Sequence, residues 1–269
     1  MDLQTEYDNR ARVPEHPGII AGWARDAAAF RDAWPHAELD IAYGLGERER
    51  LDLFRPGASE DGPVALFIHG GYWQALDRSF FSHHARGLLA QGVAVAVPSY
   101  DLCPTVPLAR IVEQMRAAAA LLHGRTGRRL LATGHSAGGQ LTAMLMATDW
   151  RALDRMLPAD LVPAGLPISG VFELEPLLPT TIGGGLHLSR EAARALSPRF
   201  LPAPGGALHA VVGGAESAEF LRQTRNFAAA WGGTSEVLVG LNHFTVLEPL
   251  TDPDSALVRR AAAMAQAIA

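Results

Sequence analysis

The sequence predicts an α/β protein in which helices cover both faces of a mostly parallel sheet of about eight strands. Two short segments, 64–69 and 93–98, are almost entirely apolar and rich in β-branched residues, which is typical of strands buried on both faces. Further strand-like segments alternate with segments that have the apolar spacing of helices. With 269 residues, of which 48% are hydrophobic, the chain (1–269) is expected to form a single domain.

Each expected strand is a short segment next to turn or helical sequence. In chain order, the expected strands are 37–43, 47–54, 64–69, 93–98, 129–133, 165–170, 207–213 and 235–240. The first two mix charged with apolar residues, which favours a half-exposed part of the sheet. The expected helices are 79–91, 107–123, 136–148, 217–231 and 254–268.

Two segments depart from this alternation. Residues 1–35 are expected to form an N-terminal arm, and residues 171–204 are rich in Pro, Gly and Leu. We interpret 171–204 as a cap above the carboxyl edge of the sheet, with an ordinary long surface connection as the alternative. The run Gly183–Gly185 follows no predicted strand and opens no predicted helix, so it is not interpreted as a nucleotide-binding loop.

The composition argues against several classes of partner. The net charge is −5, and the 23 basic residues, all arginine, are scattered, so binding of nucleic acid is not indicated. No apolar run reaches the roughly 18 residues that cross a bilayer, so no membrane association is expected. The single cysteine, Cys103, excludes a disulfide within the chain. Together with the absence of an apolar leader, it predicts a cytoplasmic protein.

The most informative motif is Gly134-His135-Ser136-Ala137-Gly138, a G-x-S-x-G. It follows a predicted strand and opens a predicted helix of small residues. Such a tight strand-to-helix turn exposes the serine in a strained backbone, and the flanking glycines avoid clashes with neighbouring chain. Ser136 is therefore predicted to be a nucleophile, with a serine that merely caps the helix as the alternative.

A serine nucleophile needs donors for the negative oxygen that forms during acyl transfer. The segment His69-Gly70-Gly71-Tyr72-Trp73 directly follows the buried strand 64–69, and its glycines let backbone N–H groups approach a substrate. We expect the N–H groups of Gly71, Tyr72 and Ala137 to form the oxyanion hole, with Gly70 as a further candidate. His69 is interpreted as a structural brace of this loop rather than a proton carrier.

The general base is expected on a loop after the last strand. His243, in Asn242-His243-Phe244, occupies this place, and no histidine lies beyond it. The acid that orients the base usually follows the preceding strand, where Glu216 stands and no Asp occurs from 207 to 251. Glu219 and Glu173 remain as alternatives. The chain order Ser, Glu, His is that of the α/β-hydrolases.

Other polar groups receive simpler interpretations. His83 and His84 are adjacent, so they would point to different helix faces and make a poor metal pair. No His or Cys cluster has zinc spacing, so neither a metal nor a cofactor is expected. Asp101 is interpreted as a carboxylate that fixes a loop, and Cys103 as a small buried residue. Oligomeric state is not encoded in any motif, and a homodimer would be compatible with the sequence.

Over essentially its whole length the chain resembles the α/β-hydrolase superfamily, and within it the kynurenine formamidase (arylformamidase) family. The stretches that carry the resemblance are EYDNRARVP (6–14), HGGYWQ (69–74), YDLCP (100–104), GHSAGGQL (134–141), SGVFELEPL (169–177) and GGAESAEFLRQT (213–224). The resemblance maps a catalytic triad onto Ser136, Glu216 and His243, and the family has Asp where this chain has Glu216. It also places Tyr7, Asn9 and Arg10 near the site, with a tethered arm as the alternative.

The resemblance implies hydrolysis of N-formyl-L-kynurenine, a small-molecule substrate, to kynurenine and formate without a cofactor. The aromatic side chains of Tyr72, Trp73 and Phe244 would flank the arylamine, or would only pack the loops. A carboxylesterase of small aryl esters with the same triad is the second hypothesis. A catalytically silent protein of this fold that binds a ligand or partner is the third.

Overall fold

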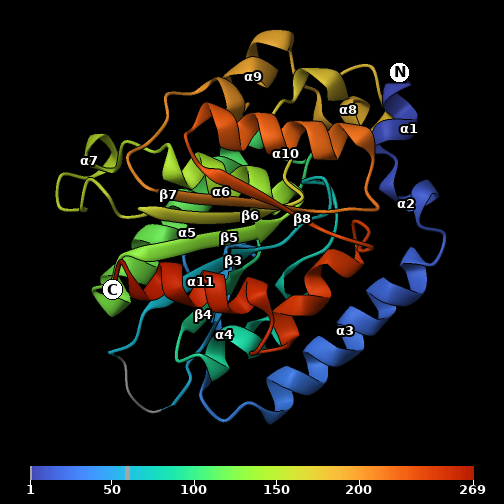
Figure 1. Ribbon diagram of the computed structural model, residues 1–269. Coiled ribbons are helices and arrows are strands. Elements are labelled where there is room, and N and C mark those ends of the chain that lie inside the picture. Colours follow the sequence, from blue (N-terminus) through green and yellow to red (C-terminus); the bar gives the residue numbers. More distant parts are fainter. Residues whose placement is uncertain (1, 58–60) are drawn as a thin grey trace.

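The computed structural model describes residues 2–57 and 61–269, and an eight-stranded sheet lies at its centre (Figure 1). The strands are β1 (Ala37–Ala42), β2 (Arg50–Phe54), β3 (Val64–Ile68), β4 (Ala94–Pro98), β5 (Leu130–His135), β6 (Ala164–Ile168), β7 (Ala207–Gly213) and β8 (Thr234–Leu238). Their order across the sheet is β1-β2-β4-β3-β5-β6-β7-β8. Only β2 runs against its neighbours β1 and β4, and the other pairs are parallel. The predicted α/β class with a mostly parallel sheet is confirmed.

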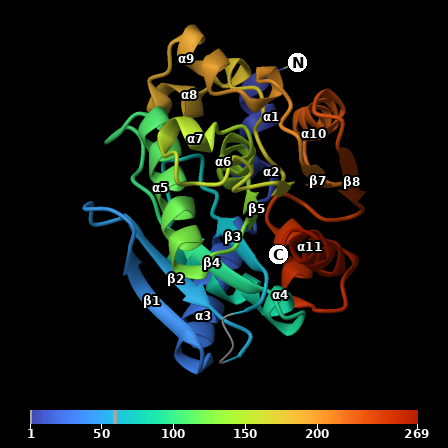
Figure 2. The same ribbon diagram turned by 90° about the vertical axis from the view of Figure 1, so that its left-hand side faces the viewer.

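Helices cover both faces of this sheet (Figures 1 and 2). One face is covered by α5 (Leu108–Thr126), α6 (Ala137–Met146) and α10 (Ala218–Ala230), whose apolar side chains form one core cluster with the sheet. The other is covered by α3 (His16–Ala33), α4 (Arg86–Ala90) and α11 (Ala256–Gln266), which form a second cluster. The strands between the two clusters are buried on both sides, which explains why β3 and β4 are apolar throughout.

The prediction of one continuous helix over 79–91 is wrong. The segment instead forms two 3₁₀ turns, η1 (Arg78–Phe80) and η2 (Ser82–Ala85), followed by the short α4. Five consecutive residues, 81–85, are buried. A regular helix on a protein surface buries one face only, so such a continuous run does not fit one. The other expected helices are present, with ends that differ by a few residues.

The arm contains three helices, α1 (Leu3–Tyr7), α2 (Asn9–Arg12) and α3. The side chains of Asp2 and Asp8 cap the first two by accepting backbone N–H groups. Figure 1 shows α1 beside α10, and α2 next to the edge of the sheet where the parallel strands end. The arm therefore reaches the edge at which loops from β3, β5, β7 and β8 meet.

The segment 171–204 forms short helical pieces between β6 and β7. They are η3 (Glu175–Leu177), α8 (Thr181–Leu186), α9 (Arg190–Ala195) and η4 (Pro198–Phe200). The Gly183–Gly185 run, which the sequence placed outside any helix, lies within α8. In the described part of the chain, no helix combines the length and apolarity needed to cross a membrane.

Candidate active site

The backbone of Ser136 is strained, as the turn between β5 and α6 requires. Its φ and ψ are 55° and −115°, a region that costs a residue with a side chain about 1–3 kcal/mol. The Ser136 N–H donates to the carbonyl oxygen of Ile168 on β6 at 2.9 Å, which holds the turn against the neighbouring strand. The serine is thereby presented at the carboxyl edge of the sheet, at the start of α6.

The two outer glycines of the motif are needed for space. A Cβ at Gly134 would lie 2.5 Å from the carbonyl oxygen of Gly138, and a Cβ at Gly138 would overlap the carbonyl oxygen of Ile68. Both obstacles are backbone atoms, which have little room to move. The spacing of the motif therefore follows from close packing of β3, β5 and α6.

His243 and Glu216 form a buried pair. The Nδ1 atom of His243 lies 2.6 Å from Oε2 of Glu216, and both side chains are at most 5% exposed. The other carboxylate oxygen of Glu216 accepts the N–H of Gly213 at 2.7 Å and the hydroxyl of Ser169 at 2.5 Å. Two donors thus hold this carboxylate in one orientation toward the imidazole ring.

The two alternative acids face away from His243. Glu173 and Glu219 both pair with the guanidinium of Arg222, at 2.8 Å and 2.7 Å. Glu219 also accepts the hydroxyl of Tyr7 at 2.8 Å. Of the three glutamates that the sequence left open, the structure brings only Glu216 into contact with the histidine.

The loop after β3 is packed directly against Ser136. A Cβ at Gly70 would lie 2.9 Å from the carbonyl oxygen of His135 and 3.1 Å from Cβ of Ser136. Gly71, Tyr72 and Trp73 all have positive φ, between 51° and 106°. Within the described residues, the N–H groups of Gly71 and Tyr72 have no acceptor. The N–H of Ala137 belongs to the first turn of α6, where helical partners are lacking.

Two residues of this loop point into the core. His69 stacks on Tyr100 with ring centres 4.1 Å apart, and burial lowers its pKa to about 4, so the ring is neutral at pH 7. Trp73 is fully buried and its indole N–H donates to Oε1 of Gln140. The expected place of Trp73 beside the substrate is therefore wrong, because the twisted backbone directs its side chain inward. His69 has the place expected of a brace.

A small cavity of about 40 Å³ lies beside Ser136. Both Ser136 and His243 line it, as does Phe244, which was expected next to the substrate. The remaining lining residues are Asn9, Arg10, Ile20, Trp23, Gly71, Tyr72, Leu76, Phe81 and His135. Ile20 and Trp23 were not predicted to lie at the site. The only sequence feature that could have indicated them is the apolar face of a helix in the arm.

His135, inside the motif, is another residue that sequence reasoning did not assign. Its Nε2 lies 2.8 Å from the carbonyl oxygen of His243, so this nitrogen carries the proton and donates. Burial holds the pKa of His135 well below its usual value, which keeps the ring neutral. The contact fixes the backbone of His243, while Glu216 engages its ring.

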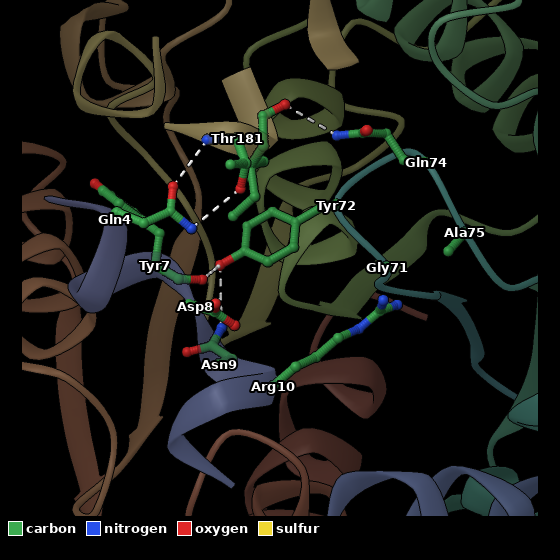
Figure 3. A pocket seen from close by; sticks show the side chains of 11 residues that line it. Gln4, Tyr7, Asp8, Asn9, Arg10, Gly71, Tyr72, Gln74, Ala75 and Thr181 are labelled. Carbon is green, nitrogen blue, oxygen red and sulfur yellow. Dashed lines mark hydrogen bonds between the residues drawn. The ribbon is translucent and has the colours of Figure 1, made fainter. Parts of the chain in front are cut away.

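A larger cavity of about 470 Å³ opens next to the small one, and Figure 3 shows its walls. The arm supplies much of this wall, and the hydroxyl of Tyr72 joins the two parts of the chain. It donates to the carbonyl oxygen of Tyr7 at 2.6 Å and accepts from Nδ2 of Asn9 at 3.1 Å. Tyr7, Asn9 and Arg10 therefore lie at the site and also belong to a tethered arm, so both interpretations of this cluster apply.

The segment 171–204 contributes Thr181 and Ile182 to the larger cavity. Gln4 of the arm bonds Thr181 through both atoms of its side-chain amide, since Nε2 donates to the Thr181 hydroxyl at 3.0 Å and Oε1 accepts the Thr181 N–H at 2.8 Å. Gln74 donates to the carbonyl oxygen of Ile182 at 3.1 Å. The segment thus borders the larger cavity rather than covering Ser136.

The remaining candidates have structural contacts. Asp101 accepts the side-chain amide of Gln114 at 2.7 Å, which fixes its loop. Cys103 is buried, and burial raises the pKa of its thiol to about 11. The expectation that His83 and His84 point to different helix faces is wrong, because both lie in a 3₁₀ turn and their buried rings have centres 4.0 Å apart. Among the residues that the structure describes, no group of three or more His, Cys, Asp or Glu side chains is placed to hold a metal ion.

The chain is similar to named kynurenine formamidases. The enzyme from Salmo salar is 30% identical over 231 residues, which cover 80% of this chain and 78% of the relative. The enzyme from Danio rerio is 28% identical over 235 residues, covering 82% and 79%. No family model matches the chain.

Solved structures with the same fold include hydrolases of several kinds. A protein from Silicibacter sp. TM1040, provisionally described as a thioesterase, is 36% identical with a TM-score of 0.89, covering 96% of this chain and 98% of its own. A Pyrobaculum calidifontis esterase is 18% identical with a TM-score of 0.75, covering 100% and 94%, which supports the fold alone. Together with the level of identity to the Salmo salar enzyme, these likenesses identify the chain as a hydrolase that belongs to the kynurenine formamidase family of the α/β-hydrolases.

Proposed function

We propose that this protein is an arylformamidase that hydrolyses N-formyl-L-kynurenine to kynurenine and formate with a triad of Ser136, His243 and Glu216. The Nδ1 atom of His243 is engaged by Glu216 at 2.6 Å, which leaves Nε2 as the ring nitrogen available to a substrate or nucleophile. In the proposed first step, the Ser136 hydroxyl oxygen attacks the formyl carbon while Nε2 takes its proton. Glu216 then stabilises the charged imidazole.

The negative oxygen that forms on the formyl carbon needs donors that are already in place. The N–H groups of Gly71 and Tyr72 are without acceptors among the described residues, and the N–H of Ala137 opens α6. Three such donors would stabilise the tetrahedral intermediate. The positive end of α6 adds a favourable field at the same place.

Collapse of this intermediate breaks the carbon–nitrogen bond. The proton held on Nε2 of His243 passes to the departing aniline nitrogen, which leaves as the free amine. A water molecule then attacks the formyl ester of Ser136, His243 accepts its proton, and the serine regains a proton as formate departs. All atoms balance without a metal or cofactor.

The single observation that carries the proposal is the size of the cavity beside Ser136. At about 40 Å³ it is small beside the neighbouring cavity of about 470 Å³, and a formyl group is the smallest acyl group. Phe244, Trp23 and the ring of Tyr72 line it with aromatic surface. The larger cavity of about 470 Å³ is the space that we assign to the arylamine.

The test compares kcat/KM on N-formyl-L-kynurenine and on p-nitrophenyl acetate. We expect a clear preference for the formamide, and loss of both activities in Ser136→Ala, since the remaining oxyanion hole gives only weak catalysis. Good hydrolysis of the ester without cleavage of the formamide would overturn the proposal.

The second candidate function is hydrolysis of small carboxylic esters or thioesters. The 36% identity to the Silicibacter protein described as a thioesterase favours it. Both functions use the same serine and histidine, so Ser136→Ala does not separate them. A series of p-nitrophenyl esters does: a rate that rises with acyl length beyond acetate would favour the esterase, because a cavity of about 40 Å³ would have to enlarge to admit longer chains.

A further inference from the structure

Arg10 occupies a distinctive place beside the nucleophile. It lines the small cavity with Ser136 and also the larger neighbouring cavity. Four residues are shared by the two cavities, namely Asn9, Arg10, Gly71 and Tyr72. Arg10 is the only arginine among the residues that line either one. Figure 3 shows its side chain extending along the cavity from α2 toward Gly71 and Ala75.

The guanidinium of Arg10 has neither an ion pair nor a hydrogen bond among the residues that the structure describes. Arg12, two residues along the same short helix, lies 4.0 Å from Glu6. The nearby carboxylate of Asp8 already accepts the backbone N–H of Ala11 at 2.9 Å. An arginine side chain has five N–H donors, and those of Arg10 are therefore free to bind a ligand.

The backbone that carries Arg10 is held firmly in place. The adjacent Asn9 is 2% exposed and donates to the hydroxyl of Tyr72 at 3.1 Å. Tyr7 is 1% exposed and its hydroxyl donates to Glu219 at 2.8 Å. The guanidinium thus projects from a fixed base into the space next to the oxyanion loop, as a binding residue requires.

We propose that Arg10 binds a carboxylate on the leaving group of the substrate, and so makes the enzyme selective for formylated arylamines that carry an amino-acid end. This inference rests on the proposed formamidase function. A guanidinium and a carboxylate form two parallel charge-assisted hydrogen bonds, which give both affinity and orientation. With the formyl group at Ser136, the leaving group extends into the larger cavity, where Arg10 meets its charged end.

The test measures a ratio of two kcat/KM values, which stays the same when a substitution lowers activity on both substrates equally. It is kcat/KM for N-formyl-L-kynurenine divided by kcat/KM for 2-formamidoacetophenone, which lacks the amino-acid end. In Arg10→Gln we expect this ratio to fall about 10-fold, mainly through KM, because the carboxylate loses its partner. Arg10→Lys keeps the charge but not the paired geometry, and is expected to recover part of the ratio.

Arg12→Gln is the matched control, because it removes the same charge from the same helix outside both cavities. It is expected to leave the ratio at the wild-type value. An unchanged ratio in Arg10→Gln, or an equal fall in Arg12→Gln, would overturn the assignment of Arg10. Added salt should lower the wild-type ratio toward that of Arg10→Gln, since screening weakens an ion pair.

Failure of the proposed function is recognised separately. Phenyl acetate and its analogue with a carboxymethyl group on the ring provide the same charged-to-neutral ratio for an enzyme that cleaves esters. A wild-type protein that cleaves neither formamide would contradict the formamidase function. The ester ratio would then still support Arg10 if it falls in Arg10→Gln, and refute it if it does not.

Discussion

At the scale of single residues, His243 is held from two sides. Its ring meets Glu216 at Nδ1, and its carbonyl oxygen accepts the Nε2–H of His135 at 2.8 Å. The carboxylate of Glu216 is in turn fixed by Gly213 and Ser169. The position of the imidazole ring therefore depends on this set of hydrogen bonds, and so does any catalysis that uses the ring.

Glu216→Gln tests the charge in this set of hydrogen bonds. We expect kcat to fall about 10³- to 10⁴-fold, because an amide does not stabilise the imidazolium and can hold the wrong tautomer. The measurement is kcat with the unfolding midpoint as a check on folding. Glu173→Gln, which touches Arg222 instead, is the control and should lower kcat by no more than about 3-fold. Equal losses in the two variants would contradict the role of Glu216.

Sequence reasoning predicted that Ser136, His243 and Glu216 lie together, because their positions follow from chain order in an alternating strand and helix pattern. The structure pairs His243 with Glu216 and places His243 with Ser136 at one cavity, while their catalytic roles stay a proposal. Sequence reasoning misplaced Trp73. Gly71, Tyr72 and Trp73 all have positive φ, so the side chains of this loop do not alternate in direction as they do in a strand. The sequence therefore does not show which of these side chains faces the cavity and which faces the core. The family resemblance placed Arg10 near the site but gave it no role, since the lining of a cavity and the lack of protein partners are visible only in three dimensions.

At the scale of elements, the close approach of the loop after β3 to α6 shapes the site. A Cβ at Gly70 would lie 2.9–3.1 Å from atoms of His135 and Ser136. Gly70→Ala should therefore push the loop away from Ser136, the proposed nucleophile, and lower kcat about 100-fold, comparable to the loss of an oxyanion donor. Steady-state kinetics with a check of folding by circular dichroism would measure it.

Gly124→Ala is the matched control for this prediction. Gly124 lies in α5, and a Cβ there has open space within 4 Å. The change should leave kcat unaltered and raise the free energy of unfolding by roughly 0.5–1 kcal/mol, because alanine favours a helix over glycine. A Gly70→Ala enzyme as active as Gly124→Ala would show that the loop tolerates displacement.

The arm is a second element whose attachment can be tested. Tyr72→Phe removes the hydroxyl that donates to Tyr7 and accepts from Asn9, so α1 and α2 each lose one partly buried hydrogen bond. We expect faster amide hydrogen exchange over residues 2–12 and a KM raised several-fold, because the arm lines both cavities. Unchanged exchange there would show that contacts of Tyr7 with Glu219 suffice to hold the arm.

The sequence predicted the strands better than the short helical segments. Strands β3 and β4 are buried on both sides and therefore have an unmistakable apolar composition. Within the 78–90 segment, residues 81–85 are buried one after another, and burial of that kind depends on α3 packing against the 3₁₀ turns. Helices α1 and α2 contain four or five residues, too few for a periodic pattern.

At the scale of the whole molecule, buried histidines make stability depend on pH. The pKa values of five are lowered, chiefly by burial, and those of His69 and His83 fall to about 4. The other three are His84, His135 and His209. An unfolded chain has histidine pKa values near 6.5, so between about pH 4 and 6.5 it binds more protons than the folded protein. Stability is then highest above pH 6.5 and falls as pH decreases through this window.

Urea unfolding at pH 8 and at pH 5 would measure this loss, which we expect to be several kcal/mol, at about 1.4 kcal/mol per group and pH unit. His84→Phe provides the control, because His84 sits among the rings of Trp23, Phe67 and Phe81 and both its nitrogens are without a partner among the described residues. In this variant, the free energy of unfolding should fall less steeply with decreasing pH. The difference in slope should correspond to about one proton fewer taken up on unfolding. A slope equal to that of the wild type would contradict this account.

The bond between Tyr7 and Glu219 has a consequence for biosynthesis. Its two partners are separated by 212 positions, and His243 follows later still. A ribosome therefore makes the arm long before the segment that receives it, and a growing chain has the wall of the cavity without Glu219, which anchors the arm, or His243, the proposed general base. Catalytic competence should appear abruptly, only when the last fifth of the polypeptide has left the exit tunnel, and nascent chains stalled before that point should be inactive.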